Sequence, residues 1–290
     1  MNKIKGTGVA LITPFNEDFS IDYDSLEKLI NHQIDGGVDY LVVMGTTGES
    51  VVLSKQEKKQ VVNFCKKVNN ARLPIVLGVG SNNTFALVEE IKSTDFDGID
   101  AVLSVSPYYN KPSQDGIYLH YKMIAEVCPL PIILYNVPGR TASNITAETT
   151  LRLANDFGNI VAVKEASGNL QQIAEIIEKR PSDFLVLSGD DGLTPKMIEM
   201  GGDGVIAVIG QSHPQIFSDM VRAALKADFE KANLLHEKLS PIYEPLYIDG
   251  NPAGIKATLN IMGICKNILR PPLVRVTEGT YSNLKKFIGH

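Results

Sequence analysis

Short apolar runs alternate with longer amphipathic stretches along most of this chain. The runs are rich in Val, Ile and Leu and cover residues 9–12, 41–44, 75–77, 101–105, 132–134, 160–163, 185–187 and 205–209. They are continuous rather than alternating, which is typical of parallel strands that are buried on both faces. Between them, residues 26–34, 147–154 and 173–177 show the spacing of amphipathic helices. The pattern predicts eight repeats of a strand followed by a helix.

Eight such repeats favour an α/β fold of the (β/α)8 TIM-barrel type over an open doubly wound sheet. The open sheet is the weaker alternative because no G-x-G-x-x-G sequence follows the first run. Two helix starts also carry sequence signatures. Ser54 and Glu57 form a capping box, and Thr194 is expected to cap a helix that has Pro195 at its first position.

Residues 210–290 are more than a final barrel helix uses. We expect a catalytic barrel over residues 1–224 and a C-terminal helical extension, packed on the barrel, over residues 225–290. The extension is predicted to contain helices near 225–239 and 255–264, and prolines mark its breaks: Pro241, Pro245, Pro252 and Pro271-Pro272.

Composition and charge exclude several classes of protein. Apolar residues make up 44% and charged residues 21% of the chain, which is ordinary for a folded domain. The net charge is −5 and the basic residues are scattered, so a nucleic-acid partner is not expected. No apolar run approaches the roughly 18 residues of a membrane span, and the N-terminal run is too short for a signal peptide. We therefore expect a cytoplasmic protein without a membrane partner.

The three cysteines, Cys65, Cys128 and Cys265, are widely spaced and odd in number. This spacing argues against a disulfide framework and against a cysteine-rich zinc site. We interpret them as small buried hydrophobic residues. The five histidines show neither H-x-H nor H-E-x-x-H spacing, so no metal site is expected.

Lys164 is the first candidate for chemistry. The active site of a (β/α)8 barrel lies at the carboxyl ends of its strands, and Lys164 ends the apolar run 160–163. Burial there disfavours the charged ammonium and favours a free amine, which attacks a carbonyl to form a Schiff base. The alternative is a structural lysine paired with Glu165.

Tyr135 ends the neighbouring run and is the second candidate. Its phenol can pass protons to and from a carbinolamine oxygen beside Lys164. The alternative is a tyrosine that only closes a layer of the barrel and bonds to backbone.

Two further features suit carboxylate groups. The turn Gly45-Thr-Thr-Gly-Glu-Ser50 converges backbone N–H groups and hydroxyls, which suits an anionic oxygen, although a simple tight turn fits as well. Arg140 can hold a second carboxylate with two hydrogen bonds or can be a solvated surface residue.

Four segments together resemble the pyruvate-dependent Schiff-base class I aldolase family. They are Gly45-Thr-Thr-Gly-Glu-Ser50, Ser106-Pro-Tyr-Tyr-Asn-Lys-Pro112, Tyr135-Asn-Val-Pro-Gly-Arg-Thr141 and Val163-Lys-Glu-Ala-Ser-Gly-Asn169. The resemblance keeps its order and spacing over nearly the whole chain. It implies a (β/α)8 barrel followed by a helical part, as the hydrophobic pattern predicts.

The resemblance also implies roles for individual residues. Lys164 matches the lysine that forms the Schiff base with pyruvate, and Tyr135 matches the phenol that relays protons. Thr46 matches the hydroxyl that links this relay to a second tyrosine. Tyr109 matches that second tyrosine, which in the family reaches into the active site of a neighbouring subunit.

The remaining matches concern substrate binding. Thr47 and the backbone of its turn match the site of the pyruvate carboxylate. Arg140 matches the arginine that holds the carboxylate of L-aspartate 4-semialdehyde. Gly189 and Ile206 match backbone positions that line the pocket.

The resemblance is nearest to the branch that condenses pyruvate with L-aspartate 4-semialdehyde on the diaminopimelate route to lysine. It implies a lyase that releases 4-hydroxy-tetrahydrodipicolinate. No cofactor is expected, because the protonated imine on Lys164 is itself the electron sink.

Two alternatives follow. N-acetylneuraminate lyases and 2-keto-3-deoxy-sugar-acid aldolases share the lysine and the tyrosine, but Thr46, Tyr109 and Arg140 together favour the condensing branch. A non-catalytic barrel that binds small keto acids belongs to another class of function. The presence of Lys164, Tyr135, Thr46 and Tyr109 together argues against it.

The resemblance further implies an oligomer and a possible effector cleft. If Tyr109 acts across an interface, at least a dimer is required, and the family commonly forms tetramers. Three residues match the cleft where lysine inhibits some members: Ser50, Asn82 and Tyr108. Inhibited members often carry two histidines and a glutamate at positions held here by Lys55, Lys58 and Ala86. The added cations and the lost carboxylate predict weak or absent inhibition by lysine.

Overall fold

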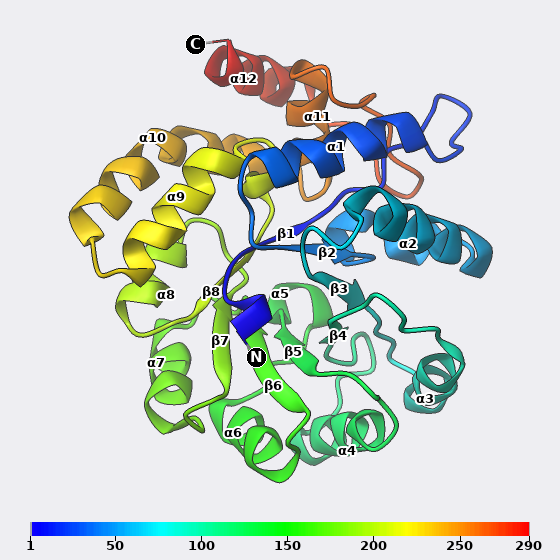
Figure 1. Cartoon of the computed structure of the whole chain (residues 1–290), viewed down its shortest axis with the longest axis vertical. Helices are drawn as coiled ribbons and strands as arrows, with labels where there is room; N and C mark the ends of the chain where they lie inside the picture. The colour runs from blue at the N-terminus through cyan, green and yellow to red at the C-terminus, as the bar shows by residue number, and fades with distance from the viewer. Residues whose placement is uncertain (1, 290) are drawn as a thin grey trace.

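The computed structural model describes residues 2–289, and its centre is a closed barrel of eight parallel strands in sequence order (Figure 1). The strands are β1 (Gly6–Ala10), β2 (Tyr40–Val43), β3 (Ile75–Gly78), β4 (Ala101–Val105), β5 (Ile132–Asn136), β6 (Ile160–Glu165), β7 (Leu185–Ser188) and β8 (Gly204–Ala207). β1 pairs with both β2 and β8, which closes the barrel. The predicted (β/α)8 fold is therefore confirmed.

Helices follow the strands and surround the barrel (Figure 1). Those of the barrel are α1 (Tyr23–Asp35), α2 (Lys55–Asn69), α3 (Thr84–Ser93), α4 (Gln114–Ala125), α5 (Pro138–Thr141), α6 (Ala147–Asp156), α7 (Leu170–Lys179), α8 (Thr194–Glu199) and α9 (Pro214–Leu225). One set of apolar side chains fills the barrel and another packs between strands and helices. No helix among residues 2–289 is both long enough and apolar enough to cross a membrane.

The last strand is shorter than the apolar run 205–209 predicted. β8 ends at Ala207, and residues Ile209–Gln211 form a 3-10 turn. The buried carboxylate of Asp191 accepts hydrogen bonds from the amides of Val208 (3.0 Å) and Ile209 (2.8 Å). Because both amides donate to Asp191, they do not continue the hydrogen-bond ladder of β8.

Of the two predicted helix starts, one is confirmed and one is wrong. Ser54 caps α2, and its side chain and that of Glu57 each bond the other's backbone N–H. Thr194 is the first residue of α8 rather than its cap. Its hydroxyl instead donates to the Asp190 carbonyl at 2.7 Å.

The chain after α9 folds into α10 (Phe229–Tyr247), α11 (Ala253–Ile261) and α12 (Glu278–Ile288). The predicted helix 225–239 is wrong at its start, because the chain turns at Ala227 with φ 58° and Asp228 caps α10. His290, the last residue of the expected extension, lies outside the described residues.

Pro241 and Pro245 do not break α10, contrary to the prediction. Proline at position 241 removes the N–H that would bond to the Glu237 carbonyl. The Ser240 hydroxyl donates to that carbonyl at 2.9 Å. The helix therefore continues through Pro241 with this acceptor satisfied.

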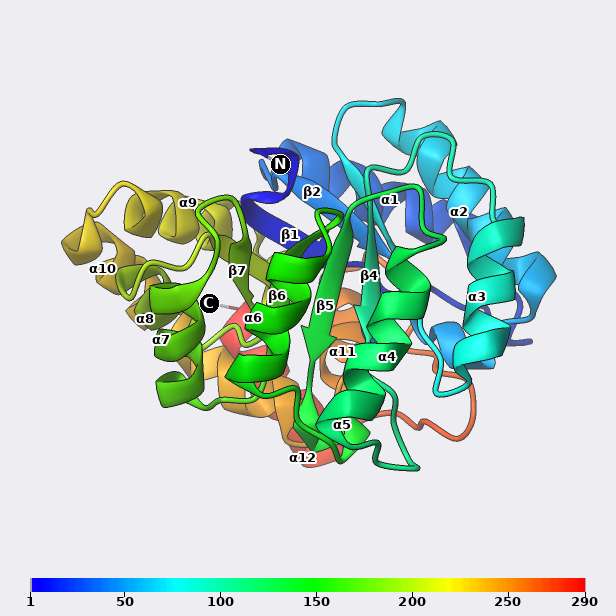
Figure 2. The same cartoon turned by 90° about the horizontal axis from the view of Figure 1, so that it is seen from below.

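The last helices lie at one end of the barrel. Figure 2 shows α11 and α12 at the same end as α5, toward which the strand arrows point, and the N-terminus at the opposite end. α10 packs against α8 and α9, and α11 against the turn after β8. The C-terminal helices thus border the end of the barrel where active sites of this fold lie.

Candidate active site

Lys164 and Tyr135 lie side by side at the ends of neighbouring strands. They are paired in the register of β5 and β6, and both are buried. Lys164 Nζ lies 4.3 Å from the centroid of the Tyr135 ring. Among the described residues no hydrogen bond joins Nζ to the Tyr135 hydroxyl, so the contact is with the face of the ring.

Glu165 does not neutralise Lys164. Successive residues of a strand point to opposite sides, so the side chains of Lys164 and Glu165 diverge. The Glu165 carboxylate accepts hydrogen bonds from Asn136 Nδ2 (3.0 and 3.1 Å) and Gln172 Nε2 (3.0 Å). Within residues 2–289 no carboxylate forms an ion pair with Lys164, which removes the structural alternative of a Lys164–Glu165 pair.

Gly189, which directly follows β7, leaves room for the Lys164 side chain. A Cβ atom at position 189 would lie 3.0 Å from Lys164 Cε and 2.6 Å from Ala166 Cβ. The Lys164 side chain can take its observed path only because position 189 has no side chain.

The turn after β2 brings hydroxyls and backbone N–H groups to the barrel mouth. Thr46, which is exposed, and Thr47, which is buried, form a short 3-10 turn with Gly48. In the described part of the chain no hydrogen bond uses the amides of Thr46 and Thr47, so both remain available to a ligand. Asn251 Nδ2 donates to the Thr47 hydroxyl at 2.9 Å.

Arg140 lies on the short helix α5, directly after the β5 strand end. It is exposed, and Nη2 donates to the Asn251 carbonyl at 3.2 Å. Asn251 therefore connects the Arg140 guanidinium to the Thr47 hydroxyl. Sequence reasoning missed Asn251, because its partners are distant in the chain.

These groups face one cavity of about 360 Å³ at the carboxyl end of the barrel. It is lined by residues from several strand ends and from α10, among them Thr46, Thr47, Tyr135, Arg140, Lys164, Gly189, Tyr243, Tyr247 and Asn251. A cavity of this size that combines one amine, hydroxyls and one guanidinium suits a small polar molecule with carboxylate and carbonyl groups.

Asp191, which is buried, and Tyr247, which is 38% exposed, form a second polar pair beside the cavity. The Tyr247 hydroxyl donates to Asp191 Oδ2 at 2.5 Å. Burial raises the pKa of Asp191 and of Tyr247 above their ordinary values. Because Asp191 also holds the Val208 and Ile209 amides, it ties α10 to the turn after β8. Val208 lines the cavity, whereas Ile206 is buried in the barrel core.

Tyr109 is not among the residues that line the cavity of its own chain. Its side chain is 88% exposed and its backbone has φ 74°, a conformation that residues other than glycine adopt rarely. This strained, exposed placement puts a large aromatic ring into solvent beside the barrel mouth.

A second cavity of about 310 Å³ adjoins the first. Ser50, Tyr108 and Lys58 line it, and Asn82 Nδ2 donates to the Tyr108 carbonyl at 3.2 Å. Glu90, which no local sequence pattern indicates, lines it as well. Lys55 and Ala86 are exposed and are not among its lining residues.

The three cysteines lie apart from the cavity linings. Cys65, Cys128 and Cys265 are free and buried, as predicted, and burial raises the pKa of the Cys65 thiol to about 12. No group of three or more His, Cys, Asp or Glu side chains within residues 2–289 is arranged to hold a metal ion.

The fold and this polar barrel mouth define a (β/α)8-barrel enzyme. The sequence matches the profile of the Dihydrodipicolinate synthetase family over residues 3–290. It is 53% identical to the 4-hydroxy-tetrahydrodipicolinate synthase of Parabacteroides distasonis, over 98% of this chain and 96% of that protein.

Solved structures of similar proteins point to the same family. The dihydrodipicolinate synthase of Thermotoga maritima superposes with a TM-score of 0.96 at 38% identity and covers 99% of this chain and 98% of its own. The enzyme of Acinetobacter baumannii, solved as a complex with pyruvate, has a TM-score of 0.95 at 38% identity and covers 99% and 98% of the two chains. The chain belongs to the dihydrodipicolinate synthetase family, whose members are lyase-type synthases.

Proposed function

We propose that this chain is a 4-hydroxy-tetrahydrodipicolinate synthase that condenses pyruvate with L-aspartate 4-semialdehyde on Lys164. The enzyme needs no cofactor, because the Lys164 imine supplies the electron sink. The observation that carries the proposal is the buried Lys164 amine, which lies over Tyr135, has no carboxylate partner within residues 2–289 and faces a cavity with separate carboxylate-binding groups.

The first half of the reaction activates pyruvate. The neutral Lys164 amine attacks the ketone carbon, and the carbinolamine oxygen leaves as water after Tyr135 delivers a proton. The Thr47 hydroxyl and the backbone amides of Thr46 and Thr47 bind the pyruvate carboxylate, which leaves the Thr46 hydroxyl to the proton relay. The protonated imine then accepts the electron pair released when the methyl carbon loses a proton, which gives an enamine.

The second half forms the new bond. The enamine carbon attacks the aldehyde of L-aspartate 4-semialdehyde, whose carboxylate binds to Arg140. The aldehyde oxygen takes up a proton through the relay of Tyr135, Thr46 and Tyr109. The amino group of the semialdehyde then attacks the imine carbon, which closes the six-membered ring and releases Lys164 as a free amine.

The relay requires a second subunit. Tyr109 is exposed in a single chain and does not line its own cavity, which suits a side chain that completes the neighbouring site. We therefore propose at least a dimer, with a tetramer as the form common in the family. Sedimentation equilibrium at catalytic concentrations should give no monomer, and Tyr109→Ala should lower the rate.

Substrate assays separate the proposal from its rivals. Pyruvate with L-aspartate 4-semialdehyde should give product, whereas N-acetylneuraminate and 2-keto-3-deoxy-gluconate should not be cleaved. Cleavage of either sugar acid without condensation would assign the chain to another branch. Binding of pyruvate without reduction onto a lysine by borohydride would favour the non-catalytic barrel.

A further inference from the structure

Glu49 lies in the turn that carries Thr46 and Thr47, but its side chain contacts the C-terminal extension. It has φ 52°, in the left-handed region, and is only 2% exposed. Its Oε1 lies 2.5 Å from Lys256 Nζ on α11, and its Oε2 accepts a hydrogen bond from the Arg270 amide at 3.1 Å. The end of the turn is thus held from outside the barrel.

Lys256 is fully buried and joins three segments that are far apart in sequence. Besides Glu49, its ammonium donates to the Ile268 carbonyl at 2.8 Å and lies 4.1 Å from the centroid of the Phe15 ring. Burial lowers the pKa of Lys256, and the adjacent Glu49 carboxylate opposes that shift. Because neither charge has contact with water, each requires the other in a fixed geometry.

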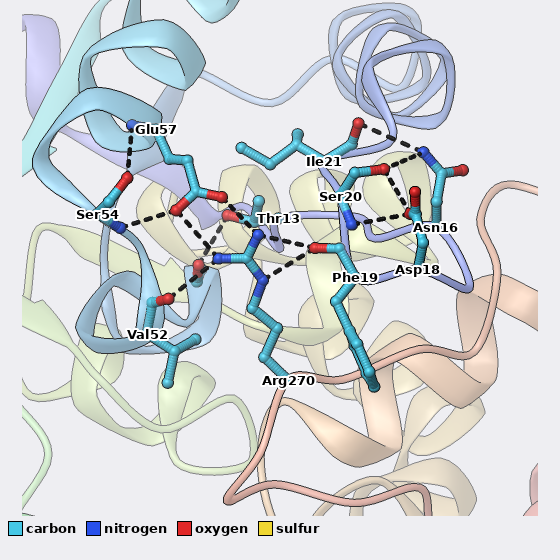
Figure 3. Close-up of polar contacts among 11 residues, drawn as sticks. Thr13, Asn16, Asp18, Phe19, Ser20, Ile21, Val52, Ser54, Glu57 and Arg270 are labelled. Atoms are coloured by element: carbon cyan, nitrogen blue, oxygen red, sulfur yellow. Dashed lines mark hydrogen bonds and ion pairs between the residues drawn. The ribbon is translucent and has the colours of Figure 1, made fainter.

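Arg270 binds the other end of the segment that begins at Glu49, residues 49–57 (Figure 3). Its guanidinium donates to both Glu57 oxygens (2.5 and 3.1 Å), to the Val52 carbonyl (3.0 Å) and to the Phe19 carbonyl (2.7 and 3.0 Å). Glu57 also bonds the Ser54 amide as part of the α2 cap. Residues 49–57 are therefore fastened to the C-terminal extension at both ends.

The turn needs this support because its backbone is strained. Met44 and Glu49, which flank the four residues 45–48, both have positive φ, at 64° and 52°. Non-glycine residues persist in such conformations only where the surrounding contacts determine them. The strained turn is also the one that presents the free amides of Thr46 and Thr47.

We propose that Glu49 and Lys256 are positioning residues for pyruvate binding: their buried ion pair fixes the turn in the conformation that directs the Thr46 and Thr47 amides at the pyruvate carboxylate. This inference rests on the proposed function. Neither residue touches the substrate, so their loss weakens pyruvate binding rather than the chemistry on Lys164. The C-terminal extension is then part of the binding site and cannot be removed without cost to affinity.

The test is a pyruvate titration of Lys164 labelling. Wild type, Glu49→Gln, Lys256→Met and the double variant are incubated with increasing pyruvate, reduced with borohydride and measured by intact mass. Each single variant should need roughly tenfold more pyruvate for half-maximal labelling, with the same final extent of one label per chain. The double variant should unfold at a higher temperature than Lys256→Met, because it leaves no buried carboxylate unpaired.

A matched control separates positioning from general instability. Thr258→Val removes a buried hydroxyl that donates to the Gly254 carbonyl within α11 and, among the described residues, makes no hydrogen bond to the turn. It should lower the unfolding temperature without changing half-maximal labelling. Wild-type half-saturation in Glu49→Gln and Lys256→Met would overturn the inference while leaving the proposed function intact.

A second measurement does not depend on activity. Amide hydrogen exchange should be faster over residues 45–52 in Glu49→Gln and Lys256→Met than in Thr258→Val, with little change in the barrel strands. Unchanged exchange in this segment would overturn the inference. A wild-type protein that pyruvate never labels would instead refute the proposed function, and the exchange data would still decide whether the ion pair holds the turn.

Discussion

Lys164 Nζ lies 4.3 Å from the centre of the Tyr135 ring, and the two residues are paired across β5 and β6. The register of the two strands alone therefore places an amine beside a phenol, and no loop contributes to this arrangement. Parallel pairing at the carboxyl end of a barrel makes this arrangement rigid, which suits a reaction that forms and breaks a bond at one nitrogen atom.

Tyr135→Phe should slow the reaction while leaving the lysine in place. The variant keeps the ring that packs against Nζ but loses the proton donor for the carbinolamine oxygen. We expect kcat to fall roughly 100-fold or more. Stopped-flow measurement of imine formation should show the same loss, and a rate equal to wild type would remove Tyr135 from the mechanism.

Gly189→Ala should obstruct Lys164. The added methyl group would lie 3.0 Å from Lys164 Cε and 2.6 Å from Ala166 Cβ, so the lysine chain must shift. Overpacking of this kind costs about 1–3 kcal/mol. Labelling of Lys164 by pyruvate and borohydride should be slowed. Gly158→Ala is the matched control, since its Cβ would meet nothing within 4 Å in the described part of the chain, and it should label like wild type.

Lysine should inhibit weakly or not at all. Lys58 lines the cavity beside Ser50 and Tyr108, and its ammonium repels a cationic effector. Glu90 lines the same cavity and supplies a carboxylate that an effector amine can contact. Lys58→Gln should therefore make the enzyme more sensitive to lysine in a rate assay. Strong inhibition of the wild type would contradict the prediction.

Acid should destabilise the fold through His120. This histidine is 2% exposed, its Nδ1 lies 2.8 Å from Thr84 Oγ1, and burial lowers its pKa to about 4. The folded state therefore keeps the ring neutral while the unfolded chain protonates near pH 6.5, so stability is complete above pH 6.5 and falls as the pH drops toward 4. The full loss is of the order of 3 kcal/mol.

Urea unfolding at several pH values checks this window. His120→Gln should reduce the difference in unfolding free energy between pH 7 and pH 5. Part of the difference should remain, because burial also lowers the pKa of His213 to about 4. An identical pH dependence in wild type and variant would show that His120 does not contribute.

The sequence alone predicts those features that depend only on residues close together in the chain. Each of the eight continuous apolar runs overlaps a strand, although the run 9–12 shares only residues 9 and 10 with β1, and Ser54 with Glu57 located the start of α2. Lys164 was singled out because a lysine at the end of an apolar strand is unusual. In each of these cases, residues that are close together in the sequence are enough to predict the feature.

Features that depend on distant contacts were missed. Nothing near Glu49 or Lys256 indicates that the two form a buried pair, and Asn251 has no local pattern that connects it to Thr47 and Arg140. The sequence predicts a helix break at Pro241, because the compensating hydrogen bond from the Ser240 hydroxyl is visible only in three dimensions.

The most direct test is the location of the pyruvate adduct. The protein is incubated with pyruvate, reduced with borohydride, digested and mapped by tandem mass spectrometry, with Lys164→Arg as the control. A single label on Lys164, absent from the control, is the predicted result. A label on another lysine, or none at saturating pyruvate, would contradict the account.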